Sequence, residues 1–381
     1  MDNVWLTAWV WMGLALLASL LSLRLGVSVA LMEILIGMAA GNIWHLQPNV
    51  WINFLASFGS LLLTFLAGSE IDPHAFRKHW RASVVIGVAS FLLPFLGALA
   101  YAYFVAGWSL ASAKLAGIAL STTSVAVVYA VMVETGLNRT DIGKAILAAC
   151  FVTDLGTVLA LGILFAGFSP WMLGFIAVTV VVLPLLPRVC GWGFRRLGGK
   201  TQEVEMKGVF LILFGLGALA TAAGSEAVLP AYLAGLVLAG TLLRYPEVAR
   251  RLRSLAFALL TPFYFLKAGL YVSLPDVWHN AWLILIFFGV KMVTKIMGVR
   301  PLASMLGYAA REANYTTLLM ATGLTFGTIS SLYGLSHHII TQAQYTVLVT
   351  VVILSALVPT MVAQTWFQPR SRVDAAIEPR G

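Results

Sequence analysis

Asp154 places a carboxylate in the middle of a long apolar segment, printed as AILAACFVTDLGTVLALGIL. A carboxylate at the centre of a membrane costs about 3 kcal/mol, so it must be neutral, paired or in contact with an aqueous cavity. A carboxyl group in such a place can exchange a proton for a cation. The alternative is a protonated aspartic acid that holds a neighbouring helix. The hydroxyl of Thr153 adds an oxygen suited to a hard cation.

Three lysines also fall inside apolar segments. Lys291 and Lys295 are one helical turn apart and share a face. We expect one of them to pair with Asp154 or to compete with the cation, and the other to extend toward the inner surface beside Arg300. Lys267 is expected to line the outer cavity.

Other ionisable residues give weaker indications. Glu33 stands inside an apolar segment and is read either as a second titrating site or as a group at a helix interface. His337 and His338 are expected in a solvated outer turn. Glu70, Asp72 and Glu226 are expected at the membrane interface. Cys150 and Cys190 do not suggest a disulfide framework or a metal cluster.

Two hydroxyl-rich runs occur near the middle of apolar segments: residues 121–124, which include Thr123 and Ser124, and residues 325–330, which include Thr325, Gly327 and Thr328. Hydroxyls can satisfy backbone groups where a membrane helix unwinds, and half-helices that meet there direct partial charges at an ion. The alternative is that these hydroxyls bond back to their own helices and pack against neighbours.

Composition identifies the class of protein that must position these residues. Of the 381 residues, 60% are hydrophobic and 10% are charged, against about 25% charged in soluble domains. The chain is therefore expected to be an all-α, polytopic membrane protein. We predict thirteen membrane spans, each long enough to cross the hydrocarbon core: about 4–24, 27–43, 51–71, 82–106, 111–134, 141–167, 170–189, 207–223, 226–243, 254–274, 279–299, 312–334 and 340–366.

An internal repeat relates two parts of the chain. The segment TFLAGSEIDP at residues 64–73 resembles YFLKAGLYVSLP at residues 264–275, and each is followed by a span with a hydroxyl-rich run. The two segments end spans an odd number apart, so the repeats would have opposite orientations in the membrane. Such inverted repeats are typical of secondary transporters.

Basic residues predict the orientation. All but four of the 24 lysines and arginines fall in segments on one side of the predicted spans, the exceptions being Lys114, Lys267, Lys291 and Lys295. This bias places the N-terminus outside and the C-terminus in the cytoplasm, and it explains the net charge of +9 without nucleic acid. The N-terminus lacks the basic start of a cleavable signal peptide, so we read residues 4–24 as a span. Residues 368–381 are expected to form a short cytoplasmic tail.

Four segments together resemble the monovalent cation:proton antiporter-2 family of the sodium/proton exchanger superfamily: FLAGSEID (65–72), STTSVAVVYAV (121–131), NRTDIGKAILAACFVTDLG (138–156), and KIMG (295–298) followed by REA (311–313). The resemblance covers nearly the whole chain. Its spacing favours Lys295 over Lys291 as the functional lysine. It implies two crossing, unwound helices in a core domain, with Asp154 as the shared site of cation and proton.

The resemblance also implies a dimer and elevator-like transport. Within one transmembrane domain of residues 1–367, the core would comprise about 51–167 and 254–366, and the scaffold or dimer domain about 4–43 and 170–243. Thr153 stands where many members have a second acidic residue, asparagine or glutamine, which leaves open whether the cycle is electrogenic. Thr328 stands where relatives often have a glutamate. Potassium-efflux members usually add a nucleotide-binding domain, and we expect none in this chain.

Together these observations predict an inner-membrane antiporter that exchanges Na⁺ or K⁺ for H⁺, with no cofactor and no enzymatic activity. Asp154 would bind the ions, Thr153, Thr123 and Ser124 would supply oxygens, and Lys295 would tune the charge. An organic-anion symporter on the same fold and a cation channel are the alternatives, since a fold does not fix a function. An intramembrane enzyme is disfavoured because the sequence shows no paired aspartates, metal-spaced histidines or Gly-x-Ser-x-Gly motif.

Overall fold

All the regular elements that the structure describes are helical, which confirms the all-α fold class. This computed structural model describes residues 3–25, 28–69, 73–135, 137, 140–165, 170–197, 203–223 and 227–369. Glu70, Asp72 and Glu226, expected at the interface, lie outside the described residues, as does residue range 370–381 of the expected tail.

The chain forms two compact units, each built from two separate stretches of sequence. Unit 1 comprises Met1–Pro73 and Val158–Tyr271, and unit 2 comprises His74–Thr157 and Val272–Gly381. The predicted core and scaffold are defined by what each part does during transport, whereas the two compact units are defined by packing alone. The division into core and scaffold therefore stays a prediction.

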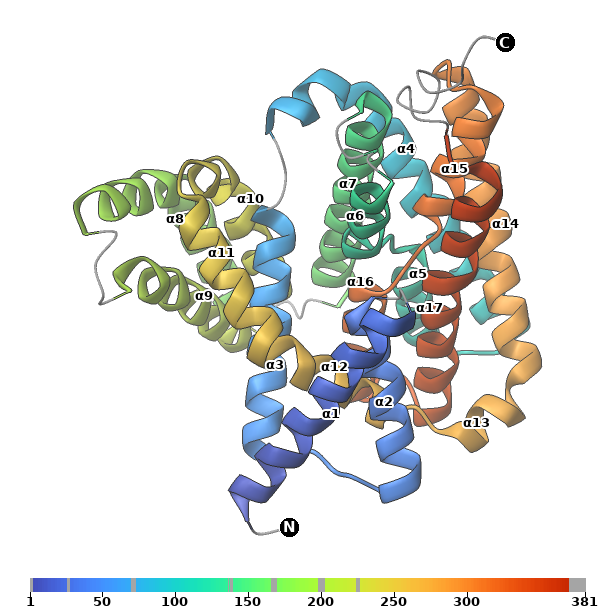
Figure 1. Ribbon diagram of the computed structural model, residues 1–381, viewed down its shortest axis with the longest axis horizontal. Helices are drawn as coiled ribbons and strands as arrows, with labels where there is room; N and C mark the ends of the chain where they lie inside the picture. Colours follow the sequence, from blue (N-terminus) through green and yellow to red (C-terminus); the bar gives the residue numbers. More distant parts are fainter. Residues whose placement is uncertain are drawn as a thin grey trace. The chain divides into compact units, whose positions relative to one another are not determined.

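Unit 1 is built from helices that pack through glycines. Helix α2 packs on α12, and α3 packs on α10 (Figure 1). A Cβ atom at Gly235 of α10 would meet the backbone oxygen of Phe65, and one at Gly68 of α3 would meet that of Tyr232. Small residues of this kind allow membrane helices to approach closely. The helices of unit 1 are α1 (Val4–Leu25), α2 (Val29–Trp44), α3 (Val50–Ser69), α8 (Pro170–Leu197), α9 (Val204–Ala222), α10 (Val228–Arg244), α11 (Pro246–Leu255), the π-helical turn η3 (Ala256–Leu260) and α12 (Thr261–Leu270).

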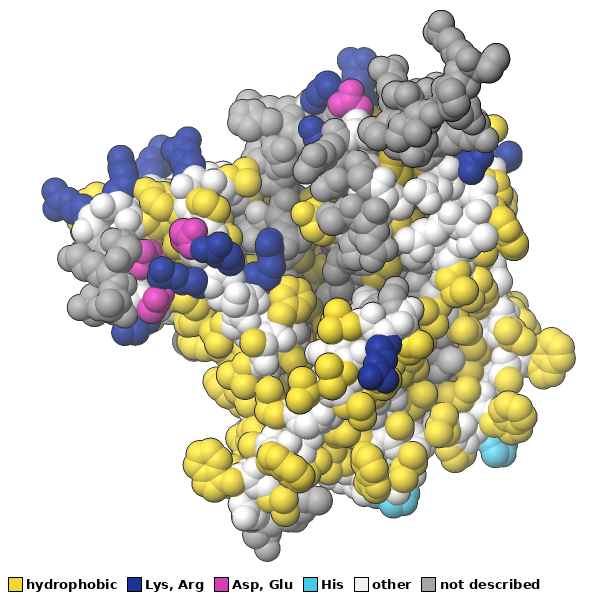
Figure 2. All heavy atoms as spheres, viewed as in Figure 1, with side chains coloured by type: hydrophobic (Ala, Val, Ile, Leu, Met, Phe, Trp, Pro, Cys, Tyr) yellow, Lys and Arg dark blue, Asp and Glu magenta, His cyan; other side chains and the backbone are white. Residues whose placement is uncertain are grey.

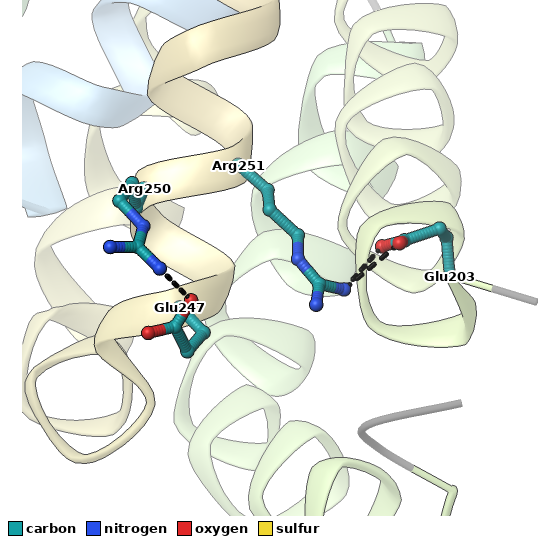
Figure 3. Close-up of polar contacts among 4 residues, drawn as sticks. All are labelled: Glu203, Glu247, Arg250 and Arg251. Atoms are coloured by element: carbon teal, nitrogen blue, oxygen red, sulfur yellow. Dashed lines mark hydrogen bonds and ion pairs between the residues drawn. The ribbon is translucent and has the colours of Figure 1, made fainter. Parts of the chain in front are cut away.

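Helix α11 is a short amphipathic helix. It buries Val248 and Leu252 and exposes its arginines. Arg251 donates to both carboxylate oxygens of Glu203, just before α9, at 2.8 and 2.9 Å (Figure 3). Arg250 pairs with Glu247 within α11. Exposed ion pairs of this kind contribute about 0–1 kcal/mol each, so they orient α11 more than they stabilise it.

Unit 2 contains the two interrupted helices. Helix α5 packs on α16, and α14 packs on both α15 and α17. The long helix α7 begins in unit 2 and enters unit 1 after Thr157. The elements of unit 2 are α4 (Pro73–Ala100), η1 (Tyr101–Val105), α5 (Leu110–Ser121), α6 (Val125–Glu134), α7 (Asp141–Leu164), α13 (Leu274–His279), α14 (Ala281–Met305), α15 (Ala310–Met320), α16 (Thr325–Ser336), α17 (Gln342–Val362) and η4 (Ala363–Phe367).

The surface confirms a membrane protein. Large apolar side chains are exposed along the helices, for example Trp5 at 84% and Leu211 at 74%. Figure 2 shows apolar side chains over much of the visible surface, with lysines and arginines gathered in unit 1 where α8 ends and along α11. Nine helical segments of the described chain are long and apolar enough to cross a membrane, and three shorter apolar helices accompany them. This criterion does not confirm the predicted count of thirteen spans.

Candidate functional site

Two helices of unit 2 are interrupted and meet at their interruptions. The breaks are residues 122–124, between α5 and α6, and residues 321–324, between α15 and α16. The backbone N–H of Ser124 donates to the carbonyl oxygen of Thr322 at 2.8 Å. This bond joins one break to the other, so the two unwound segments are in contact, and the first of them lies where the sequence predicted it.

Hydroxyl side chains satisfy the helix ends at both breaks. Thr122 and Thr322 each donate to the carbonyl oxygen three residues earlier, at 3.1 and 2.7 Å. The Ser124 hydroxyl accepts the backbone N–H of Val127 at 3.4 Å and so caps the start of α6. Thr122 and Thr322 therefore make the same kind of bond at the two breaks.

The second break lies a few residues before the position expected from the sequence. Thr325, Gly327 and Thr328 form the first turn of α16, and the Thr328 hydroxyl donates to the Leu324 carbonyl at 2.8 Å. A Cβ atom at Gly327 would come within 2.9 Å of the Ala119 carbonyl oxygen on α5. This glycine therefore permits close helix packing and is not itself a point of unwinding.

Four helix ends converge at the crossing. The C-terminal ends of α5 and α15 present carbonyl oxygens, and the N-terminal ends of α6 and α16 present N–H groups. Partial charges of both signs therefore face one another in a buried place. Such a site can interact with a mobile ion, but it also needs fixed charges to balance the exposed dipoles.

Asp154 supplies the negative charge. Its side chain is 1% exposed, and its Oδ1 atom has no hydrogen-bond partner among the described residues. Buried polar atoms are nearly always paired, so this oxygen is available as a ligand. Asp154 interacts electrostatically with Lys295. The two are not in direct contact as an ion pair, since no ion pair within the described chain joins Asp154 to Lys295 or Lys291.

Lys295 bonds directly to the first break. Its Nζ atom donates to Ser90 Oγ at 2.7 Å, to the Ser121 carbonyl oxygen at 2.9 Å and to Thr123 Oγ1 at 3.0 Å. The Ser121 carbonyl is the last of α5, where the helix dipole favours a cation. The positive charge of Lys295 thus balances the partial negative charge at the C-terminal end of α5. It also interacts electrostatically with Asp154.

Lys291 points to the second break. Its Nζ atom donates to Ser355 Oγ at 2.9 Å, and Ser355 in turn lies 2.9 Å from the Val352 carbonyl oxygen and 3.3 Å from that of Gly323. Both lysines are fully buried. The expectation that one of them extends to the inner surface beside Arg300 was therefore wrong, because Lys295 finds oxygen acceptors beside the first break and Lys291 finds the Ser355 hydroxyl on α17.

The three hydroxyls expected to accompany Asp154 occupy different places. Thr153 Oγ1 donates to the Ala149 carbonyl oxygen of its own helix at 3.0 Å. Thr123 Oγ1 donates to the Met320 carbonyl oxygen at 2.8 Å while accepting from the lysine. Ser124 is the helix cap described above. Their hydroxyl oxygens retain lone pairs, and their service as cation ligands stays a prediction.

Two residues of the site were not assigned from the sequence. Ser90 on α4 and Ser355 on α17 are the partners of the two lysines. Each is a single hydroxyl in an apolar run, VASFLLPF and VVILSALVP respectively. An isolated hydroxyl in an apolar run indicates a polar residue at membrane depth. The run does not indicate which neighbouring helix the hydroxyl faces.

Glu33, Lys267 and the two outer-turn histidines lie apart from this crossing. Glu33 is 2% exposed on α2, and Lys267 is half-buried on α12, both in unit 1. His337 and His338 are exposed, as expected for a solvated turn. Cys150 and Cys190 are free and buried.

Comparisons with known proteins agree on one family. Residues 12–368 match the family described as sodium/hydrogen exchanger, transmembrane. The Na⁺/H⁺-K⁺ antiporter GerN of Bacillus cereus is 25% identical over 92% of this chain and 93% of its own length. A Na⁺/H⁺ antiporter of Enterococcus hirae is 26% identical over 91% and 93% respectively.

A solved structure shares the fold. The sodium proton antiporter MjNhaP1 of Methanocaldococcus jannaschii superimposes with a TM-score of 0.69 at 16% identity, over 96% of this chain and 99% of its own. The match of the family description across nearly the whole chain confirms the resemblance drawn from the sequence motifs. The chain belongs to the transmembrane sodium/hydrogen exchanger family.

Proposed function

We propose that this protein exchanges Na⁺ or K⁺ for H⁺ across a membrane, with Asp154 as the shared binding site. One observation carries the proposal: the buried carboxylate of Asp154 has an oxygen with no hydrogen-bond partner in the described chain. This carboxylate also interacts electrostatically with Lys295. The relatives named as Na⁺/H⁺ and Na⁺/H⁺-K⁺ antiporters support these two cations and the proton.

Competition at one carboxylate couples the two fluxes. An ionised, unoccupied Asp154 would be costly to carry through the membrane interior, whereas a protonated or cation-bound Asp154 is neutralised. The site therefore changes the side that it faces only when one ligand or the other is bound. Loss of one ligand and gain of the other at each side then gives exchange.

The oxygens around the crossing would complete the cation site. Thr153, Thr123 and Ser124 are the proposed donors, because neutral oxygens can replace part of the hydration shell of a monovalent cation. Lys295 remains beside them as a fixed positive charge that limits how tightly a cation is held. Cavity size and ligand geometry decide between Na⁺ and K⁺.

The remaining features follow from the family likeness and from charge. We propose a homodimer in the inner membrane, with the N-terminus outside and an elevator-like movement of the core against the scaffold. The positive-inside bias supports the orientation. The fold shared with a sodium proton antiporter is consistent with the movement.

Asp154→Asn tests the site. In proteoliposomes we expect the variant to insert and fold but to lose cation-driven dissipation of a pH gradient, because an amide neither binds a proton at neutral pH nor neutralises a cation. Asp141→Asn is the matched control, since Asp141 is an exposed carboxylate on the same helix, 65% accessible and paired with Lys78. Full activity of Asp154→Asn, or equal loss in both variants, would contradict the mechanism.

A further inference from the structure

A thiol and a thioether meet beside the crossing of the two interrupted helices. The Cys150 thiol on α7 donates to the Sδ atom of Met320, the last residue of α15, at a distance of 3.7 Å. Both side chains are fully buried. The two residues are 170 positions apart, so no sequence motif marks the pair. The fold thus brings two soft ligand atoms together in the protein interior.

This sulfur pair belongs to the same cluster as the proposed ion-binding carboxylate. The Met320 carbonyl oxygen accepts from Thr123 Oγ1 at 2.8 Å, and Thr123 itself accepts from Lys295 at 3.0 Å. Cys150 stands one helical turn before Asp154 on α7, and residues four apart share a helix face. Cys150 also interacts electrostatically with both Asp154 and Lys295. A metal ion on the two sulfurs would therefore stand beside the exchange site.

The spacing of the two sulfurs suits a single soft ion. Thiolate and thioether ligands select soft ions such as Cu⁺, whereas Na⁺ and K⁺ prefer oxygen. A bond from a thiolate sulfur to a metal ion is about 2.3 Å long, as for Zn²⁺. The 3.7 Å between the two sulfurs is shorter than two such bonds, so one ion can contact both. The angle at the ion is then bent, and one side of the ion stays open.

The surroundings favour a monovalent ion. A thiolate and a monovalent ion together form a neutral pair, which a buried apolar place can hold without the cost of a buried charge. Zn²⁺ usually takes four ligands from cysteine, histidine and carboxylates. The part of the chain that the structure describes contains no group of three or more such residues able to hold a metal.

We propose that Cys150 and Met320 bind a soft monovalent metal ion such as Cu⁺ or Ag⁺, and that the bound ion stops exchange by engaging Asp154. The S–H bond of Cys150 breaks, a metal–sulfur bond forms and the proton goes to water, so nothing is oxidised or reduced. Asp154 Oδ1 has no hydrogen-bond partner in the described chain and can take the open side of the ion. A carboxylate held in this way is not available to a proton or to Na⁺ or K⁺. The block rests on the exchange function proposed above, whereas the metal site does not.

Close packing alone would also bring these sulfurs together, because cysteine and methionine fill cores as apolar side chains. A packed pair and a ligand pair differ in their affinity for soft ions. A single thiol binds such an ion about as tightly as a thiol in solution does, whereas a thioether held beside it adds a second bond. Competition with a free thiol therefore distinguishes the two.

Silver binding to the purified protein tests the metal site. Ag⁺ is the probe, because it stays monovalent without a reductant and a bare ion can enter where a larger thiol reagent is excluded. Cys190→Ser is the parent variant, since it leaves Cys150 as its one cysteine. The protein is incubated with AgNO₃ and an excess of free cysteine in chloride-free detergent solution and then desalted. We expect elemental mass spectrometry to count one silver ion per chain.

Two further substitutions in this parent assign the ligands. Cys150→Ser should abolish silver binding. Loss of an outer partner of a metal site already costs about 10–100-fold in affinity, so loss of a direct ligand in Met320→Leu should cost at least about tenfold. Met32→Leu, which changes a buried methionine of unit 1, is the matched control and should change nothing. No silver in the parent, or equal affinity in Met320→Leu and Met32→Leu, would overturn the metal site.

Transport in proteoliposomes tests the block. The rate of cation-dependent pH-gradient dissipation in each variant is compared with its own rate without silver. AgNO₃ should stop exchange in the Cys190→Ser parent and leave the Cys150→Ser variant at its silver-free rate. Bound silver with unchanged exchange in the parent, or equal inhibition of both proteins, would overturn the block. Absence of exchange even without silver would instead contradict the exchange function, and the count of bound silver would still decide the metal site.

Discussion

At the scale of the residue, a single ammonium group holds the first helix break in place. Lys295→Ala would remove three hydrogen bonds at once and leave the Ser121 carbonyl without its charged donor. Hydrogen bonds to charged groups contribute about 1.5–3 kcal/mol each, so we expect a clear fall in the melting temperature of the detergent-solubilised protein. Ser90→Ala removes one acceptor and should produce a smaller fall.

The comparison needs a control for loss of charge alone. Lys207→Ala removes an exposed lysine on α9 and should leave the melting temperature unchanged. If Lys295→Ala melts like the wild type, or if Ser90→Ala is the more damaging change, then Lys295 does not hold the break.

Charged residues of the site are readable from the sequence, and their partners are not. Asp154 and Lys295 stand out because a charge in an apolar segment is expensive. Ser90 and Ser355 do not, because hydroxyls are common in membrane helices and often bond their own backbone, as Ser121 does with the Ile118 carbonyl. Which hydroxyl meets which lysine depends on helix packing over more than 60 positions of sequence, such as 64 for Lys291 and Ser355.

At the scale of the element, glycine decides how closely helices approach. Gly235→Ala should destabilise the pairing of α10 with α3, because the new Cβ atom would collide with the Phe65 carbonyl oxygen. Overpacking of this kind costs about 1–3 kcal/mol. The matched control is Gly240→Ala on the same helix, where nothing lies within 4 Å of the new atom and helix propensity improves.

Thermal unfolding of both glycine variants in detergent gives the comparison. A lower melting temperature for Gly235→Ala, with an equal or higher one for Gly240→Ala, is the expected result. Equal effects of the two substitutions would show that the close approach of α3 and α10 contributes nothing to stability.

A glycine in a membrane helix can mark either close packing or a point of unwinding, and this explains why the second break was expected at the wrong residues. The hydroxyl-rich run around Gly327 looked like the unwound segment, but that glycine serves close packing against α5, and the chain unwinds at residues 321–324. Likewise, residues 254–274 read as one regular apolar span, whereas the structure has the end of amphipathic α11, the π-helical turn η3 and α12 following one another without a gap, and α12 ends at Leu270. Apolar composition reports membrane depth but not the regularity of the helix.

At the scale of the whole molecule, the distribution of basic residues predicts which side each connection faces. The connection between α2 and α3 should lie outside, and the one between α14 and α15, flanked by Arg300 and Arg311, should lie in the cytoplasm. Cysteines introduced at the exposed residues Gln47 and Ser304 report these two connections.

An impermeant maleimide should label Gln47→Cys in intact cells, and Ser304→Cys only after the membrane is opened. The wild type is the control, because Cys150 and Cys190 are buried and should not react. Labelling of Ser304→Cys but not Gln47→Cys in intact cells would contradict the predicted orientation.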